Sequence, residues 1–255
     1  MTLPARELIE QMRSNGWVHD AQGERVPVDS AVDEAEGALL ERLVRDNGCR
    51  RTLEVGCAYG LSSLHICGAL PPDALHTIID PNQSTQWKGI GRLGLERAGL
   101  SNWELIEQGS EIALPRLLSE GAGRFDLIFI DGWHTFDHTL VDCFYATKLL
   151  RTGGILVVDD GQLPSVRRAL RHISTYPCYQ HIASTPLAPT RTRQVLEASK
   201  APLRAVGKHL PLRLSTELLD ASVLQSDVQR GIRGGCVAFR KVAEDQRSWD
   251  WYEPF

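Results

Sequence analysis

The chain has 255 residues, which fits one large α/β domain or two small ones and is enough to bury a sizeable core. With 42% hydrophobic residues, 24% charged residues and a net charge of −4, its composition excludes a disordered chain and a general polyanion-binding protein. Its longest apolar runs, LIFI and ILVV, have the length of strands and are too short to cross a membrane.

The predicted elements begin with two helices, near 5–13 and near 31–46. The second helix stops at Asn47-Gly48 and has one apolar face, formed by Leu39, Leu40, Leu43 and Val44. Apolar strands and helices then alternate along the chain. Strands are predicted at 52–56, 75–80, 103–107, 126–131 and 154–159, and helices between them at 61–69, about 86–99, 110–119 and 136–150. This alternation predicts an α/β fold whose parallel sheet is covered by helices on both faces.

Four of these strands end in an acidic residue or a glycine turn, in the stretches LEVGCAYG, TIIDPN, FIDGWH and VVDDG. In a parallel sheet these ends lie on one rim, and ligands bind outside the carboxyl ends of the strands. Clustered carboxylates repel one another unless they share a cation or a hydroxyl. The rim is therefore predicted to hold a ligand.

The first of these turns has the spacing Gly56-x-x-x-Gly60, which is not the nicotinamide fingerprint G-x-G-x-x-G. Glu54, two residues before the first glycine, suits a cationic ammonium group better than a pyrophosphate. Asp80 ends the next strand and is placed to accept hydrogen bonds from two ribose hydroxyls. Each feature alone is also compatible with an ordinary loop, but together they favour a positively charged nucleoside ligand.

With the step Gly109-Ser110 and the stretch GGILVVDD, these motifs resemble the class I S-adenosylmethionine-dependent methyltransferases. More narrowly, they are similar to the metal-dependent O-methyltransferases, of the catechol type and of the bacterial type that methylates antibiotic (macrolide) sugars. The resemblance spans about 50–161, with a weaker echo at the C-terminal end. It implies a doubly wound, mostly parallel, Rossmann-like sheet of seven strands. Two further strands, near 179–184 and near 235–242, would complete the seven, and the last of them would be antiparallel. Residues 49–255 would form the methyltransferase domain, and residues 1–48 a helical cap of the same domain.

The resemblance also implies which residues bind S-adenosylmethionine. Asp80 would bind the ribose, and Ser110 would lie near the adenine. The methionine part of the cofactor would be lined by Glu54, Gly56, Gly60 and Ser62. One departure is Ala58, which stands where many methyltransferases have a middle glycine.

A divalent cation, usually magnesium, would be coordinated by Asp131, Asp159 and Asp160. His134 falls where the catechol group has a lysine base and the antibiotic-sugar group a histidine, so the resemblance makes His134 and Asp131 the catalytic pair. Asp160 departs from the catechol group, in which this ligand is often asparagine, and makes the site more acidic.

The chemistry of methyl transfer to an alcohol supports this assignment independently. A hydroxyl is a poor nucleophile, so the site must lower its pKa or remove its proton. Magnesium on carboxylates serves the first purpose and a nearby histidine the second. A structural alternative also fits these residues, in which Asp159 and Asp160 cap a loop and His134 caps the helix that starts near Thr135. Asp137 either orients His134 or compensates the helix dipole.

The segment 161–213 contains nine Lys or Arg residues and one acid, Glu197, in a chain of net negative charge. We expect a basic insertion at about 185–234, before the last strand. It would serve as a lid, as a dimer contact, as a cradle for an anionic acceptor, or only as a solvated basic face. Aromatic residues are sparse in the basic stretch 161–213, which contains Tyr176 and Tyr179. This disfavours binding of single-stranded nucleic acid.

The stretch MTLPARELIEQM lacks the apolar core of a secretory signal, and the six cysteines contain no C-x-x-C pair. We therefore expect a cytoplasmic protein with reduced thiols, neither membrane-bound nor zinc-binding. The expected function is metal-dependent O-methylation of a small molecule, a sugar or phenol of secondary metabolism. The alternatives are an RNA methyltransferase of the same fold and a non-catalytic S-adenosylmethionine-binding protein.

Overall fold

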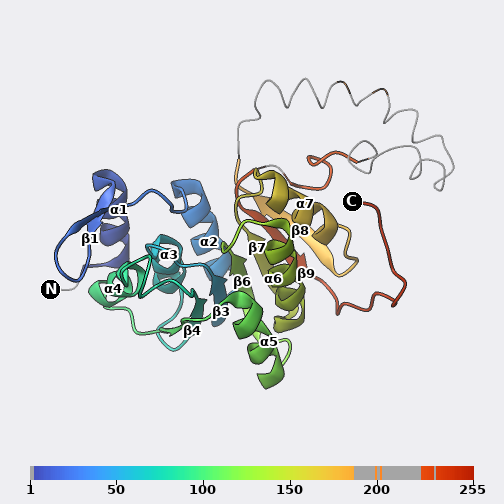
Figure 1. The fold of residues 1–255 in the computed structure, drawn as a ribbon. Helices are drawn as coiled ribbons and strands as arrows, with labels where there is room; N and C mark the ends of the chain where they lie inside the picture. Colours follow the sequence, from blue (N-terminus) through green and yellow to red (C-terminus); the bar gives the residue numbers. More distant parts are fainter. Residues whose placement is uncertain (1–2, 187–198, 200–201, 203–224, 233) are drawn as a thin grey trace.

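Seven strands form one sheet in the order β5-β4-β3-β6-β7-β9-β8 in the computed structural model of the chain, which describes residues 3–186, 199, 202, 225–232 and 234–255 (Figure 1). The first five strands of this order are parallel, and β9 runs antiparallel to both of its neighbours. The strand bounds are β3 Arg51–Val55, β4 Leu75–Ile79, β5 Trp103–Ile106, β6 Phe125–Ile130, β7 Leu150–Val158, β8 Tyr179–Ser184 and β9 Val237–Lys241. The predicted seven-stranded, mostly parallel sheet with an antiparallel last strand is confirmed.

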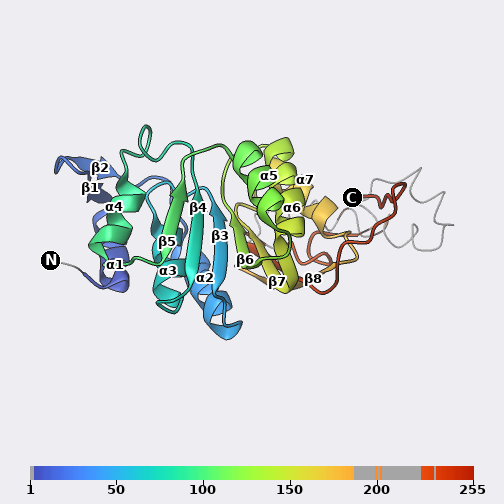
Figure 2. The same ribbon diagram turned by 90° about the horizontal axis from the view of Figure 1, so that it is seen from below.

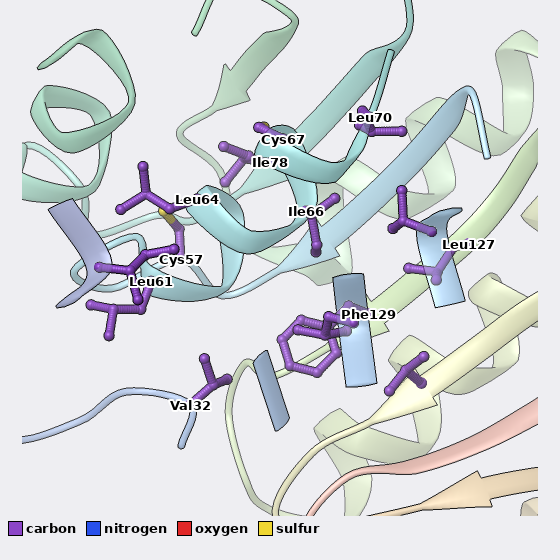
Figure 3. Close-up of a cluster of buried hydrophobic side chains, with 14 of the residues drawn as sticks. Val32, Cys57, Leu61, Leu64, Ile66, Cys67, Leu70, Ile78, Leu127 and Phe129 are labelled. Atoms are coloured by element: carbon purple, nitrogen blue, oxygen red, sulfur yellow. The ribbon is translucent and has the colours of Figure 1, made fainter. Parts of the chain in front are cut away.

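Helices cover both faces of the sheet, as its continuously apolar strands require (Figures 1 and 2). Alternate residues of β6 enter two different cores, because successive side chains of a strand point to opposite faces. Leu127 and Phe129 pack with α1 (Ala5–Asn15), α2 (Glu34–Asp46), α3 (Leu61–Ala69) and α4 (Ile90–Arg97). Figure 3 shows part of this cluster, with Phe129 below α3. Ile128 and Ile130 pack with α5 (Ser110–Glu120), α6 (Phe136–Leu149) and α7 (Pro164–Ile173).

Helix α2 begins with a capping box. The Asp33 carboxylate accepts from the N–H of Glu36 at 2.8 Å, and the Glu36 carboxylate accepts from the N–H of Asp33 at 2.7 Å. These reciprocal bonds satisfy two backbone donors that a helix start leaves free. They hold the start of α2 in shape, where the Glu36 carboxylate also approaches Asp159 at the end of β7.

Three local features differ from the sequence-based expectation. Helix α4 starts at Ile90 rather than near 86, because Lys88 and Gly89 adopt left-handed backbone conformations that a helix cannot include. A two-stranded hairpin, β1 (Trp17–His19) with β2 (Arg25–Pro27), was not expected. Helix α7 was also missed, because its apolar positions are interleaved with the basic residues of the positively charged stretch.

The expected basic insertion begins just after β8, and most of it lies outside the described residues, including Arg191, Arg193, Lys200, Arg204, Lys208 and Arg213. All six cysteines lie in the described part, and each is buried and free of a disulfide. Within the described residues, no helix combines the length and the apolar character needed to span a membrane.

Candidate active site

Strand register places the predicted site residues at one level of the sheet rim. Val55 pairs with Ile79 on one side and with Ile130 on the other, and Ile130 pairs with Val158. The residues that follow these strand ends are Asp80, Gly56, Asp131 and Asp159, which are therefore neighbours in that order. The backbone hydrogen bonds between neighbouring strands continue for one residue past the strand ends. The N–H of Asp131 donates to the carbonyl oxygen of Val55 at 2.8 Å, and the N–H of Asp159 donates to the carbonyl oxygen of Ile130 at 2.9 Å.

A cavity of about 500 Å³ opens above this rim. The glycine turn forms part of the cavity wall. Predicted site residues that also line the cavity include Asp80, Ser110, Asp131 and His134. Ser62, in the first turn of α3, also lines it and is otherwise buried. The segment Ser30–Val32, which leads into α2, also lines the cavity. The volume is in the range of small-molecule and cofactor sites.

The glycine turn lies so close to the acidic rim that no side chain fits at its first position. Gly56 has a φ of +90°, and a Cβ there would lie 2.0 Å from the carbonyl oxygen of Asp131. Gly60, the N-cap of α3, has a φ of +85° and packs against Gly91, but it does not line the cavity. Ala58, which replaces the expected middle glycine, adopts a φ of +45°. The departure from the family pattern is thus accommodated by a left-handed alanine.

Asp80 holds this turn in shape. One carboxylate oxygen accepts from the backbone N–H groups of Cys57 and Ala58, at 3.0 and 2.9 Å, and the other accepts from the N–H of Asn82 at 2.8 Å. Asp80 also lines the cavity, so its structural role in the turn leaves it at the wall where a ribose-binding residue was predicted.

Glu54 lies elsewhere than the sequence suggested. Its side chain is fully buried and does not line the cavity. One oxygen accepts hydrogen bonds from Ser63 and from Nε2 of His76, at 3.0 Å for the histidine, and the other has no hydrogen-bond partner among the described residues. In this position the Glu54 carboxylate does not reach the cavity and cannot contact a ligand there directly.

Asp131, His134 and Asp160 form a compact group. Nε2 of His134 lies 3.3 Å from Asp131, and Nδ1 lies 3.2 Å from Asp160, so the imidazole bridges the two carboxylates. The hydrogen bond to Asp131 raises the pKa of His134, although burial opposes this, and the charges of Asp131 and Asp160 add to the rise. Burial raises the pKa of Asp131 to about 6, against the lowering effect of His134.

Asp159 is the centre of a second group. Its carboxylate accepts from the N–H of Asp160 at 2.8 Å and from the Cys236 thiol at 3.2 Å. Glu36, from α2, belongs to the same group, with ligand atoms of all three residues within 4.8 Å. Burial and the charge of Asp131 raise the pKa of Asp159 to about 7, and burial and the charge of Asp159 raise that of Glu36 to about 7.

Glu36 is the site residue that the sequence analysis missed. The pattern Asp33-x-x-Glu36 is visible in the sequence as a capping box, but it shows nothing of the second oxygen, which faces the end of the sheet. The space for that oxygen comes from Gly235, where a Cβ would lie 2.2 Å from it. Only the folded chain brings these positions together.

The three acids predicted to hold a cation are divided between these two groups, with Asp131 and Asp160 in the first and Asp159 in the second. Their carboxylate oxygens are of the kind that fits a hard divalent cation. Within the described part of the chain, Asp131, Asp159 and Asp160 have no Lys or Arg within ion-pair distance, and His134 is the sole cationic candidate that contacts them. Carboxylate oxygens are the ligands that magnesium prefers. Burial is the main cause of the raised pKa values of Asp131 and Asp159, and the charges of neighbouring acids add to it.

Comparisons with known proteins find relatives of this chain among the methyltransferases. Residues 53–161 match a family described as "Methyltransferase domain". A Mycolicibacterium smegmatis protein named "Putative O-methyltransferase" is 32% identical over 160 residues, covering 56% of this chain and 73% of the relative. Catechol O-methyltransferase B of Danio rerio is 29% identical over 199 residues, covering 71% and 74%. Among solved structures, the O-methyltransferase TomG of Streptomyces achromogenes, in complex with SAM, is 26% identical with a TM-score of 0.54, covering 70% of this chain and 80% of TomG.

Proposed function

The chain belongs to the class I S-adenosylmethionine-dependent O-methyltransferases, and from this premise we propose that it methylates a hydroxyl of a small molecule with the help of a divalent cation. The observation that carries the proposal is the position of Asp131. This residue lines the cavity and, with His134 and Asp160, forms one of the acidic groups at its edge. Cofactor space and acidic groups therefore adjoin on one rim.

The cofactor would occupy the cavity beside the glycine turn. Asp80 keeps the turn in shape through the N–H groups of Cys57 and Ala58 and offers its carboxylate to the ribose. Ser62 and Ser110 supply hydroxyl groups along the wall. The absence of a side chain at Gly56 lets the backbone approach a ligand closely.

Asp131, Asp159 and Asp160 would hold the cation, which when bound supplies Lewis-acid polarisation of the acceptor hydroxyl. His134 accepts the proton of that hydroxyl through one ring nitrogen, while Asp131 or Asp160 accepts from the other ring nitrogen and orients the imidazole. The hydroxyl oxygen forms a bond to the methyl carbon as the carbon–sulfur bond of the cofactor breaks, and its electron pair remains on sulfur. The products are the methyl ether, S-adenosylhomocysteine and a protonated histidine.

A phenol or a sugar of secondary metabolism is the acceptor we propose. Trp133 lines the cavity next to Asp131 and is 65% exposed, so it offers an apolar face to an acceptor at the cavity mouth. The similarity to a catechol O-methyltransferase favours a phenol. The part of the basic insertion proposed to cradle an anionic acceptor lies outside the described residues.

The test is a methyl-transfer assay against a panel of phenols, sugars and hydroxylated natural products, with magnesium or with EDTA. Magnesium-dependent ether formation on one class supports the proposal. Binding of the cofactor without turnover of any acceptor would favour a non-catalytic binding protein. Transfer to RNA but not to small molecules would favour the RNA methyltransferase alternative.

A further inference from the structure

A polar network lies beneath the glycine turn, outside the cavity. Its members are Thr52 and Glu54 on β3, Ser63 on α3 and His76 on β4, and the side chains of all four are completely buried. The network joins the neighbouring strands β3 and β4 to α3, the helix that follows the turn. Nothing in the proposed chemistry so far uses His76.

His76 stands between two partners. Its Nε2 lies 3.0 Å from Glu54, and its Nδ1 lies 2.9 Å from the hydroxyl of Thr52. The distances fit an imidazole whose Nε2–H donates to the Glu54 carboxylate and whose Nδ1 accepts from the Thr52 hydroxyl. Glu54 then has one fixed donor from each of His76 and Ser63.

The charge of Glu54 acts on a residue that lines the cavity. Burial raises the pKa of the Cys57 thiol well above its ordinary value, and the charge of Glu54 adds to the rise. Cys57 is also joined to the network directly, since its sulfur lies 3.3 Å from the Ser63 hydroxyl.

This anion has no full counter-charge inside the described part of the protein. His76 is its sole ion-pair partner there, and the second carboxylate oxygen has no hydrogen-bond partner. A buried charge of this kind is costly, and apolar residues of similar volume would often be neutral or stabilising. A cation in the adjoining cavity would offset the cost.

We propose that His76 is a positioning residue that fixes Glu54 as a buried anion below the cavity, and that this anion favours the positively charged cofactor over its neutral product. The inference rests on the proposed function, because S-adenosylmethionine carries a sulfonium charge that S-adenosylhomocysteine lacks. Glu54 then acts through its field rather than by contact. Product release is favoured as soon as the methyl group, and the charge with it, has left.

Two substitutions of His76 separate this role from a structural one. In His76→Gln the amide nitrogen extends to the position of Nε2 and keeps a donor to Glu54. In His76→Asn the shorter amide reaches only the position of Nδ1 and the Thr52 hydroxyl. Both variants are polar and smaller than histidine, so they disturb packing similarly. Glu54→Gln removes the charge and keeps the shape.

The experiment is calorimetric titration of the full chain with S-adenosylmethionine and with S-adenosylhomocysteine. We expect the preference for S-adenosylmethionine to fall about tenfold in Glu54→Gln, as for the loss of one screened charge. It should fall by a smaller factor in His76→Asn, which keeps the carboxylate but removes the donor that positions it, and stay within twofold in His76→Gln. The double variant His76→Asn/Glu54→Gln should show no further fall.

A purely structural network would weaken both ligands equally, so an unchanged preference in Glu54→Gln or His76→Asn overturns the inference and leaves the proposed function intact. If wild-type protein binds neither ligand, the cofactor assignment and the inference both fall. Thermal unfolding of each variant shows that it is folded. If His76→Asn does not fold, Glu54→Gln and His76→Gln decide the matter by the same preference.

Discussion

The carboxyl groups of Glu36 and Asp159 meet at the junction between the start of α2 and the end of β7, within 4.8 Å of each other. One oxygen of Glu36 belongs to the capping box of α2, and the other faces Gly235. The helix start that follows the cavity wall Ser30–Val32 is therefore in direct electrostatic contact with the acidic rim.

This contact predicts a pH-dependent stability in EDTA. The pKa of Glu36 is about 7 in the folded protein against an ordinary 4.5, so the folded state holds more protons between these values. The free energy of unfolding therefore falls as pH rises from about 4.5 through 7. In Glu36→Gln the pH-dependent change in the free energy of unfolding should be smaller by about 1 kcal/mol, after allowance for solvent exposure. The reason is that the amide stays neutral at every pH, while its oxygen still accepts from the N–H of Asp33.

Thermal unfolding at pH 5, 6, 7 and 8 measures the effect. Glu34→Gln is the matched control, since Glu34 is exposed and lies in the same first turn. Parallel pH curves for wild type and Glu36→Gln would contradict the prediction.

Removal of the cation should abolish turnover and leave the cofactor bound, because the cation serves the acceptor. Asp159→Asn and Asp160→Asn should each need more magnesium for half-maximal rate. Asp137→Asn, a change at an exposed acid in the first turn of α6, should not. Rate against free magnesium concentration gives the comparison, and full activity after thorough chelation would place the enzyme in the metal-independent branch.

His134→Gln should lower kcat by roughly 10²–10⁴-fold, the usual contribution of a positioned general base, with nearly constant cofactor affinity. Asp131 and Asp160 raise the pKa of His134 in the absence of a cation. A cation on the same carboxylates opposes that rise, so the acidic limb of the pH–rate profile should move to lower pH as magnesium saturates. A loss under tenfold with the limb unchanged would remove His134 from the mechanism and favour an acidic phenol as acceptor.

Gly56→Ala should destabilise the protein by about 2–4 kcal/mol and weaken the cofactor, because the new Cβ meets the backbone of Asp131. Gly23→Ala is the matched control. Gly23 has a φ of +82°, close to the +90° of Gly56, but nothing lies within 4 Å of its Cβ position. The difference between the two variants in chemical denaturation isolates the steric term from the backbone strain, and equal losses would refute a close approach at Gly56.

Asp80→Ala should weaken S-adenosylmethionine by roughly 1–3 kcal/mol. It removes the acceptor of the Cys57 and Ala58 N–H groups as well as any ribose contact. In Asp80→Asn the amide oxygen can still accept from the turn, but the amide nitrogen cannot accept from the N–H of Asn82. This variant should therefore lose less stability than Asp80→Ala and lose part of the affinity. Calorimetry that finds unchanged affinity in Asp80→Ala would contradict both roles.

The central sheet could be predicted from the sequence because its signal is local. Stretches such as FDLIFI are buried on both faces, and the apolar run itself reports this. The same holds for α3, predicted at 61–69 and found at Leu61–Ala69. Helix α4 was predicted to start too early, since nothing in the local composition marks the left-handed turn at Lys88.

The site was predictable only as far as strand ends determine it. Asp80, Gly56, Asp131 and Asp159 follow aligned strands, so a parallel register brings them together. Glu36 and His76 depend on helix packing and on the face of a neighbouring strand, and no local pattern encodes either contact. Glu54 was identified from its motif, but the side of the strand on which its carboxylate lies is a property of the packed core.

Antiparallel pairing of β8 with β9 places Ser184 opposite Val237, so the two ends of the segment between them are anchored side by side. Lengthening a loop whose ends are already fixed costs little, about 0.6 kcal/mol for each doubling of its length. A change in the length of this segment therefore costs the pairing of β8 with β9 little. The strand register that aligns Gly56, Asp80, Asp131 and Asp159 does not depend on that length.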